Sequence, residues 1–218
     1  MKKKKFPLVV SLLALVFLSA ACRAETLDEA NELDARVRNF LESRFSQWYD
    51  MNVPPSDGQL LYDLIVANGY TRALEIGTST GHSGIWIAWA LSKTGGKLVT
   101  IEIDEARHRE ALENFREAGL SEYIDARLGD AHQLVKDLDG PFDFVFSDAD
   151  KGWYKNYFID IDPKLEVNGC FTAHNISGAG RGYWGTGEFF QYVSGLPNYD
   201  TTLNRSGGGV SISYKRSE

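Results

Sequence analysis

The sequence is poor in cysteine, and this excludes a disulfide framework as the basis of the fold. The chain of 218 residues contains only two, Cys22 and Cys170. Cys22 closes an apolar N-terminal stretch, so Cys170 has no partner for a structural bridge. Cys170 begins an apolar run, where we expect it to be a small buried hydrophobic side chain.

Basic clusters are also absent from the sequence beyond its first residues, and this argues against nucleic acid as a partner. Once residues 1–22 are set aside, 19 Lys and Arg remain against 30 Asp and Glu, a formal net charge near −11. Proteins that bind nucleic acid carry the opposite balance over their contact surface. We therefore expect that the protein has no nucleic acid partner and acts on a small molecule instead.

The sequence contains no internal repeat, low-complexity tract or linker, so its length and its 43% of hydrophobic residues predict one globular domain. Only the first 22 residues depart from this, with "MKKKKFPLVVSLLALVFLSAAC". Four lysines, a short apolar run and small residues before Cys22 are typical of a secretory signal or a lipoprotein leader. This predicts a protein that is exported, periplasmic or membrane-anchored, and leaves open whether the leader is cleaved, lipidated or retained.

Hydrophobic spacing divides the remaining chain into a helix over 23–50 and an α/β domain over 51–218. In the domain, short apolar runs alternate with helical stretches, which predicts parallel strands covered by helices on both faces. A Gly-rich turn between two final strands predicts an antiparallel C-terminal hairpin. The strands are expected at 72–76, 97–102, 123–128, 142–147 and 169–173, and in the hairpin after residue 198.

Carboxylates follow several of these predicted strands, at the sheet edge where α/β proteins bind ligands. Glu75 precedes the glycine turn "GTSTGHSG" and would repel a bound pyrophosphate. S-adenosylmethionine has an ammonium and a sulfonium and no phosphate, so it suits this edge better than NAD. Glu102 can accept hydrogen bonds from ribose hydroxyls, and Asp130 can accept one from the adenine amino group or cap the next helix.

From residue 51 onward the sequence resembles the class I S-adenosylmethionine-dependent O-methyltransferases of the catechol and caffeoyl-CoA type. The resemblance rests on "MNVPPSDGQLL", "LEIGTSTGHSGIWIAWAL", "TIEIDEARHREALENFREAG", "ARLGDAHQL", "FDFVFSDADKGWYKNYF" and "GCFTAHN". It implies the Rossmann-like fold of that class, with a mostly parallel seven-stranded sheet. The cofactor residues that it implies are Val53, Glu75, Gly77 and Ser83 at the methionine end, Glu102 at the ribose, Asp130 and Ala131 at the adenine, and Asp148.

The resemblance also implies a base and a divalent cation. Lys151 would take the proton of the acceptor hydroxyl, and Asp148, His174 and Asn175 would be the metal ligands. The family pattern has Asp where this sequence has His174. Because Mg²⁺ prefers oxygen ligands, this set predicts a softer ion such as Mn²⁺, weak binding, or no metal at all.

The sequence thus predicts methyl transfer to a hydroxyl oxygen of a small catechol-like or aromatic acceptor. Two alternatives stay open: N-methylation of another acceptor, and cofactor binding with degenerate, metal-free chemistry. An NAD-dependent dehydrogenase is disfavoured by Glu75 and by the glycine spacing. Formation of a homodimer is also left open.

Overall fold

The computed structural model describes residues 32–48, 51–176 and 185–218. The predicted leader over 1–22 lies outside these residues, as does the first part of the predicted helix over 23–50. Within the described ranges, helical residues extend from 32 to 43, and a short 3-10 helix follows at Phe45–Gln47. None of the described helices combines the length and the apolar character that crossing a bilayer requires.

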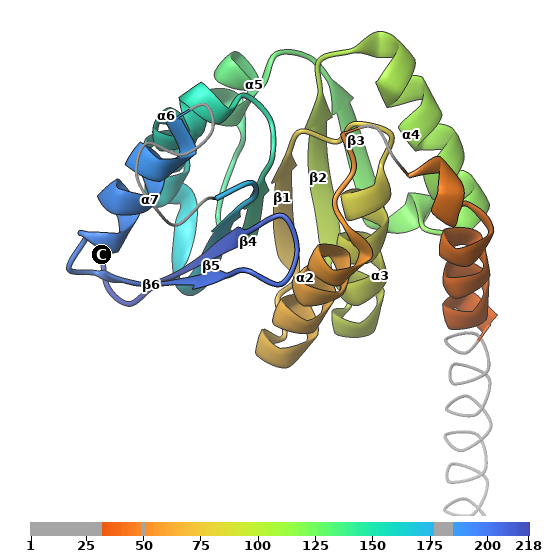
Figure 1. Ribbon diagram of the computed structural model, residues 1–218, viewed down its shortest axis with the longest axis horizontal. Coiled ribbons are helices and arrows are strands. Elements are labelled where there is room, and N and C mark those ends of the chain that lie inside the picture. The colour runs from red at the N-terminus through yellow and green to blue at the C-terminus, as the bar shows by residue number, and fades with distance from the viewer. Residues whose placement is uncertain (1–31, 49–50, 177–184) are drawn as a thin grey trace, which may run out of the picture.

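A seven-stranded sheet in the order β3-β2-β1-β4-β5-β7-β6 forms the centre of the molecule (Figure 1). Strands β1 to β5 pair in parallel, and β7 is antiparallel to both of its neighbours, so the predicted sheet and C-terminal hairpin are confirmed. The strands are β1 (Arg72–Ile76), β2 (Lys97–Glu102), β3 (Ile124–Leu128), β4 (Phe142–Ser147), β5 (Leu165–Ala173), β6 (Tyr199–Asn204) and β7 (Val210–Lys215).

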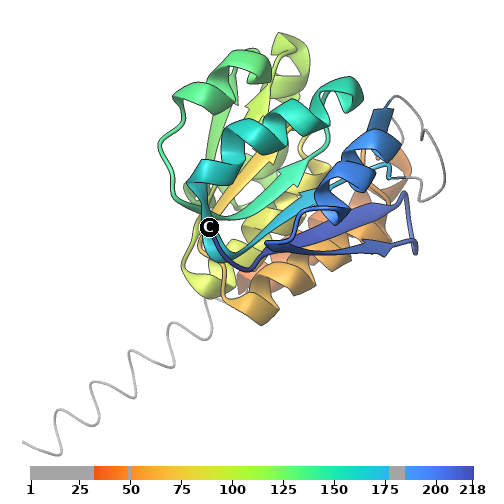
Figure 2. The ribbon, with the colours of Figure 1, turned by 90° about the vertical axis from the view of Figure 1, so that its left-hand side faces the viewer.

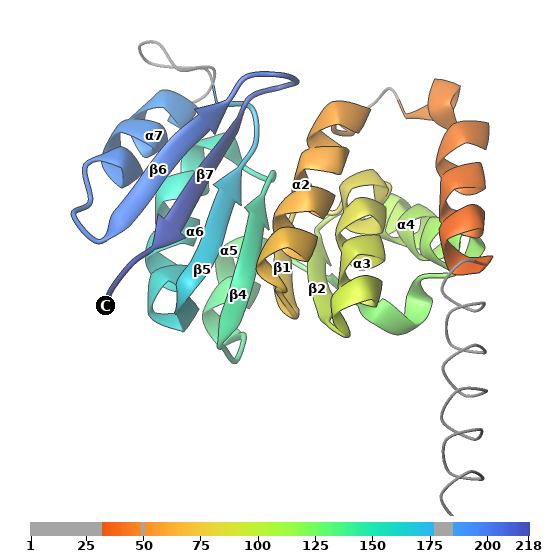
Figure 3. The same ribbon diagram turned by 90° about the horizontal axis from the view of Figure 1, so that it is seen from below.

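Helices cover both faces of this sheet, as Figures 2 and 3 show from two further directions. One face carries α5 (Ala131–Asp137), α6 (Tyr154–Ile161) and α7 (Thr186–Ser194), and the other carries α2 (Pro55–Asn68), α3 (His82–Thr94) and α4 (Glu105–Ala118). Successive residues of β1 serve the two faces, because side chains alternate along a strand. Leu74 and Ile76 pack with α5 and α6, whereas Ala73 packs with α2 and α3.

The helical segment 32–43 packs outside α3 and α4. Val37 and Phe40 are buried together with Trp89 and Phe115 in a separate apolar cluster. Arg36 donates hydrogen bonds to two carbonyl oxygens in the last turn of α4, at 2.8 and 2.9 Å. Carbonyls in a last helical turn lack the usual partners within the helix, although that of Arg116 also accepts from the amide of Gly119, so the contact adds to the cap of α4 and fixes the N-terminal segment.

Short loops join the strands β1 to β4 to the helices that follow them, at one edge of the sheet. Asp104 caps α4 by accepting from the amides of Ala106 and Arg107, each at 2.9 Å. Cys170 is fully buried in β5, as expected from its apolar surroundings in the sequence. Because the strands β1 to β5 are parallel, the loops that follow them lie at the same edge of the sheet, and the predicted site residues lie at this edge.

Candidate active site

A cavity of about 780 Å³ opens at the carboxyl ends of the parallel strands. All but two of the predicted site residues line this cavity, and the exceptions are Val53 and Glu75. Those on the wall are Gly77, Ser83, Glu102, Asp130, Ala131, Asp148, Lys151, His174 and Asn175. The edge of the sheet thus brings together residues that are almost 100 positions apart in the sequence.

Glu102 ends β2 and is held by backbone amides of two loops. Its Oε2 accepts from the amide of Ser79 at 2.7 Å, and its Oε1 accepts from those of Ile103 and Asp104 at 3.0 and 2.9 Å. A carboxylate has room for about four hydrogen bonds, so capacity remains on the cavity side. The side chain is 7% exposed and therefore fixed in one orientation for a ligand with paired hydroxyls.

The glycine turn after β1 is explained by close approach of the protein backbone. Gly77 has a φ of +100°, which favours glycine. A Cβ at this position would lie 2.9 Å from the amide nitrogen of Ala149, in the loop after β4. Gly77 thus lets the ends of β1 and β4 meet, and the amide of Asp148 donates to the carbonyl oxygen of Ile76 at 2.8 Å.

Glu75 is fully buried and is not among the residues that line the cavity. Its Oε2 accepts from the hydroxyl of Thr100 at 2.6 Å, and Ser83 is a second hydrogen-bond partner. Burial raises the pKa of Glu75 to about 8, although both hydroxyls oppose the rise. Its Oε1 is buried with no partner among the described residues, which marks an acceptor left for a group outside the chain.

Val53 is buried next to His82, and neither residue is among those that line the cavity. The Nδ1 of His82 lies 3.0 Å from the carbonyl oxygen of Val53, and Trp86 donates to its Nε2 at 3.3 Å. Burial lowers the pKa of His82 to about 4, so this ring is neutral. Trp48 stacks on it with a centroid separation of 4.7 Å. The segment before α2 is thereby fastened to the start of α3.

Asp130 is the N-cap of α5, which was one of its two predicted roles. It accepts from the amide of His132 at 2.9 Å and lines the cavity at the same time. The Nε2 of His132 lies 3.3 Å from a carboxylate oxygen of Asp150, and its ring packs against Trp153 at 4.5 Å between centroids. Capping and ligand contact are therefore compatible at Asp130.

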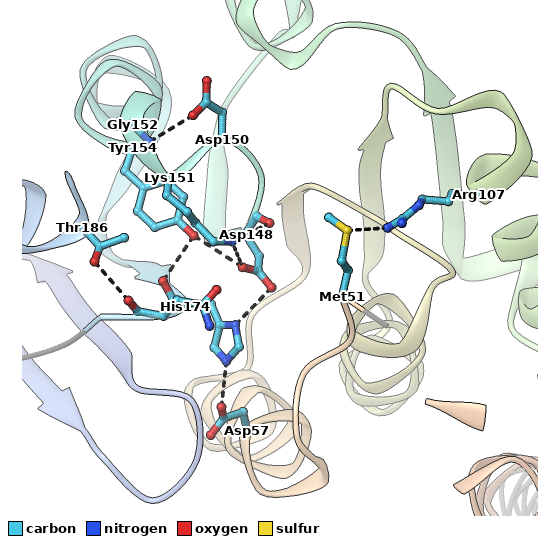
Figure 4. A network of polar contacts seen from close by, with 11 residues as sticks. Met51, Asp57, Arg107, Asp148, Asp150, Lys151, Gly152, Tyr154, His174 and Thr186 are labelled. Atoms are coloured by element: carbon cyan, nitrogen blue, oxygen red, sulfur yellow. Dashed lines mark hydrogen bonds and ion pairs between the residues drawn. The ribbon is translucent and has the colours of Figure 1, made fainter. Parts of the chain in front are cut away.

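Asp148 follows β4 and is the centre of a network of polar side chains (Figure 4). Lys151 donates to one of its carboxylate oxygens and, at 3.0 Å, to its carbonyl oxygen. Tyr154 donates to Asp148 at 3.4 Å and to the carbonyl oxygen of His174 at 3.2 Å. Burial alone would raise the pKa of Asp148, but His174 and Lys151 outweigh it and hold the pKa below its usual value.

His174 follows β5 and lies between two carboxylates. Its Nδ1 is 3.1 Å from Oδ2 of Asp148, and its Nε2 is 2.8 Å from Oδ2 of Asp57 in the first turn of α2 (Figure 4). Burial would lower the pKa of His174, but the two carboxylates raise it to about 9. Each ring nitrogen thus faces a carboxylate oxygen, a pairing that an imidazole with both nitrogens protonated satisfies.

The arrangement does not fit the divalent cation that the sequence left as one alternative. A histidine ligand offers a nitrogen lone pair, and both nitrogens of His174 face carboxylate oxygens. Asn175 stands beside it with a φ of +56°. Within the described ranges, no group of three His, Cys, Asp or Glu side chains is arranged to hold a metal ion.

Several cavity residues were missed by sequence reasoning. Ser79, Arg107 and Tyr157 line the wall, and Asp57 reaches it through His174. Ser79 stands in the glycine turn, so the turn itself was a signal for it. Asp57 had none, because an acid in the first turn of a helix is explained by the helix dipole alone.

Comparisons with known proteins all find similarity to O-methyltransferases. A family model described as "O-methyltransferase" matches residues 25–180. A catechol O-methyltransferase of Niastella koreensis is 40% identical over 112 residues, which are 50% of this chain and 50% of that protein. The chain spans about half the length of the curated relatives that it matches first.

Solved structures are similar over more of the chain. The O-methyltransferase from Bacillus cereus, crystallised in complex with SAH, is 26% identical with a TM-score of 0.71, covering 84% of this chain and 91% of that one. The O-methyltransferase TomG from Streptomyces achromogenes, in complex with SAM, is 25% identical with a TM-score of 0.72, covering 84% and 90%. Both share the arrangement of the sheet and its helices.

Proposed function

Because the chain belongs to the O-methyltransferase family, we propose that it transfers a methyl group from S-adenosylmethionine to a hydroxyl oxygen of a small, catechol-like acceptor. The observation that carries this proposal is the cavity, which has the amide-held carboxylate of Glu102 on one side and Lys151 with Asp148 on the other. The similarity to a catechol O-methyltransferase and to caffeoyl-CoA O-methyltransferases supports the acceptor class.

The chemistry of the wall suits a cofactor that has a ribose and positive charge. Glu102, Asp130 and Ala131 all lie on the cavity wall, where Glu102 would accept from the two ribose hydroxyls and Asp130 with Ala131 would contact the adenine. Ser83 lies on the wall and bonds to Glu75 behind it, and a bound ammonium at the methionine end would favour the charged form of Glu75. A pyrophosphate would meet these carboxylates at a cost.

Two residues of the chain would act on the acceptor. Lys151 lies on the wall with its side-chain nitrogen against Asp148, and in its neutral amine form it would accept the proton of the acceptor hydroxyl. The bound cofactor supplies an electrophilic methyl group, and the hydroxyl oxygen forms the new bond to this carbon as the bond from carbon to sulfur breaks. Asp148 compensates the charge on Lys151 and fixes the position of its nitrogen.

Calorimetric titration of the folded chain with S-adenosylmethionine and with NAD tests the cofactor, and formation of S-adenosylhomocysteine tests the reaction. We expect binding of S-adenosylmethionine and turnover with a catechol. We expect no turnover with a diol of similar size whose hydroxyls are not phenolic. Binding of NAD in preference to S-adenosylmethionine would overturn the proposal. Turnover with an amine and none with catechols would correct the acceptor to nitrogen.

We also propose that residues 1–22 export or anchor the domain, so that it works outside the cytosol. The order of four lysines, an apolar run and "SAAC" supports this. Mass spectrometry of the N-terminus of protein expressed in a bacterial host would show cleavage before Cys22, with or without lipid. An intact leader in the cytosolic fraction would contradict it. Light scattering of the same sample tests whether a homodimer forms.

A further inference from the structure

Three segments that are distant in the sequence meet around the ring of His174, next to Asp148 and Lys151. His174 follows β5, Asp57 lies in α2, and the turn between β6 and β7 covers both. The ring is 5% exposed and the Asp57 side chain 1% exposed. Such burial of polar groups is costly unless each is paired, so their pairing must be explained.

Both sides of the ring are used by hydrogen bonds. A neutral imidazole has one donor and one acceptor nitrogen, and a carboxylate accepts but does not donate. The two carboxylates that face His174 are Asp148 at 3.1 Å and Asp57 at 2.8 Å. Ligation of a metal ion would need one of these nitrogens to leave its carboxylate and turn toward the ion.

Asp57 is held so that its side chain stays against the ring. Its Oδ2 accepts from the amide of Gly208 at 2.7 Å as well as facing Nε2 of His174. Its Oδ1 is buried without a partner in the described part of the chain. Removing the ring would leave a buried carboxylate with one backbone amide as its partner, which is strongly unfavourable.

The covering turn has glycines where any larger residue would collide with this pair. A Cβ on Gly207 would lie 2.0 Å from Oδ1 of Asp57, and one on Gly208 would lie 2.5 Å from Nε2 of His174. Contacts under 3.0 Å require something to shift. The "GGG" of the turn, which the proposed methyl transfer does not otherwise use, is thus shaped to seal the Asp57–His174 pair from the side away from the cavity.

We propose that Asp57, His174 and Asp148 form a protein-built replacement for a divalent cation: the ring fills the cation's place, bridges the two carboxylates and orients Asp148 and Lys151 for the acceptor. The site accordingly works without metal. His174 and Asp57 are positioning residues, because they act through Asp148. This inference rests on the proposed methyl transfer only for its kinetic consequences.

Metal binding by the purified protein tests the first part, with Mn²⁺ alone as the probe and its EPR signal as the readout. We expect the wild-type chain to bind Mn²⁺ weakly, with a dissociation constant of about 1 mM or higher. His174→Asp should bind it at least about tenfold more tightly, since an oxygen ligand replaces the bridging ring. Stoichiometric binding to the wild type, or no gain in the variant, would overturn the proposal.

The protonation of the ring gives a readout that needs no variant. Long-range ¹H–¹⁵N correlation spectra at neutral pH should show that both nitrogens of His174 carry protons, and that those of His82 do not. A single protonated nitrogen on His174 would mean that the ring does not bridge the carboxylates. Neither this measurement nor the EPR titration uses an acceptor, so both keep their meaning if methyl transfer is not found.

Kinetics test the positioning role. With catechol as acceptor, wild-type turnover should be unchanged by EDTA. Asp57→Asn should lower kcat about tenfold or more, while the KM and the dissociation constant for S-adenosylmethionine stay within about twofold. Asp63→Asn is the matched control, because Asp63 is exposed on the same helix and bonds to Gln59. Loss of activity with EDTA, or an unchanged kcat in Asp57→Asn, would contradict the proposal.

Discussion

The two halves of the cavity hold their carboxylates in different ways. At the β2 end, Glu102 is fixed by three backbone amides. At the β4 end, Asp148 is fixed by the side chains of Lys151, Tyr154 and His174. The first half is a polar cradle with little freedom to move protons, whereas the second is a chain of ionisable groups. This difference matches the roles that we propose, binding of a cofactor on one side and proton transfer on the other.

The largest expected effect is on the ionisable half. Lys151→Met should lower kcat by about 10²- to 10⁴-fold, the range for loss of a group that transfers a proton. The dissociation constant for S-adenosylmethionine should change little, because Lys151 is not among the residues expected to hold the cofactor. Stopped assays for S-adenosylhomocysteine together with calorimetry measure both.

Lys155→Met is the control for this change. Lys155 lies on α6 near Lys151 in sequence, but its nitrogen packs over the ring of Tyr192 at 4.3 Å. We expect this variant to keep wild-type kcat. Equal losses in the two variants would mean that Lys151 supports the fold and not the reaction.

In the half that holds Glu102 by backbone amides, a substitution should change the dissociation constant for S-adenosylmethionine more than kcat. Glu102→Gln keeps the shape but replaces one oxygen by an NH2 group, which can accept neither from the backbone amides nor from ribose hydroxyls, so binding of S-adenosylmethionine should weaken by about 10- to 100-fold. Once cofactor saturates, kcat should lie within a few-fold of wild type. Glu105→Gln, which lies three residues away and pairs with Arg109 on the surface, is the matched control. A large fall in kcat at saturating cofactor would contradict the proposal that one half binds the cofactor and the other transfers the proton.

Glu75 gives a pH test of the cradle. Its pKa is raised from 4.5 to about 8 in the folded chain, so the folded state holds this proton more tightly than the unfolded state. The resulting stability is fully present below pH 4.5 and is lost as the pH rises through about 8. Chemical denaturation should show this loss, on the order of 1–2 kcal/mol after allowance for relaxation of the site.

Glu75→Gln cannot ionise and keeps nearly the same volume. Its free energy of unfolding should therefore vary less than that of the wild type over the same pH interval. The comparison is made without cofactor, because an ammonium near Glu75 would favour its charged form. Parallel pH curves for the two proteins would show that Glu75 is not the group responsible.

The same contrast explains what could be predicted from the sequence. The cradle is local: Gly77, Glu102 and Asp130 each lie at the end of a strand or within two residues of it, so strand ends and their loops were enough to place them together. The other half combines the residues that follow β4 and β5, which strand ends also placed, with Asp57 of α2 and the β6–β7 turn. Nothing near Asp57 in the sequence indicates a partner 117 positions away, and the hydrogen bond to His174 appears only in the folded chain. Glu75 was identified correctly as unusual, but periodicity does not tell whether a strand-end carboxylate faces the cavity or the helix above it.

The smallest expected effects separate the two roles of Asp130, whose carboxylate caps α5 and lies on the cavity wall. Asn is about as good an N-cap as Asp, whereas Ala is not, so Asp130→Ala should lower the free energy of unfolding by about 1 kcal/mol and Asp130→Asn by much less. If the carboxylate also accepts from the adenine amino group, both variants should weaken binding of S-adenosylmethionine by a few-fold. The Asn variant is then the decisive one, since it loses charge without losing the cap. Wild-type affinity in Asp130→Asn would assign Asp130 to the helix alone, and the cradle would then rest on Glu102.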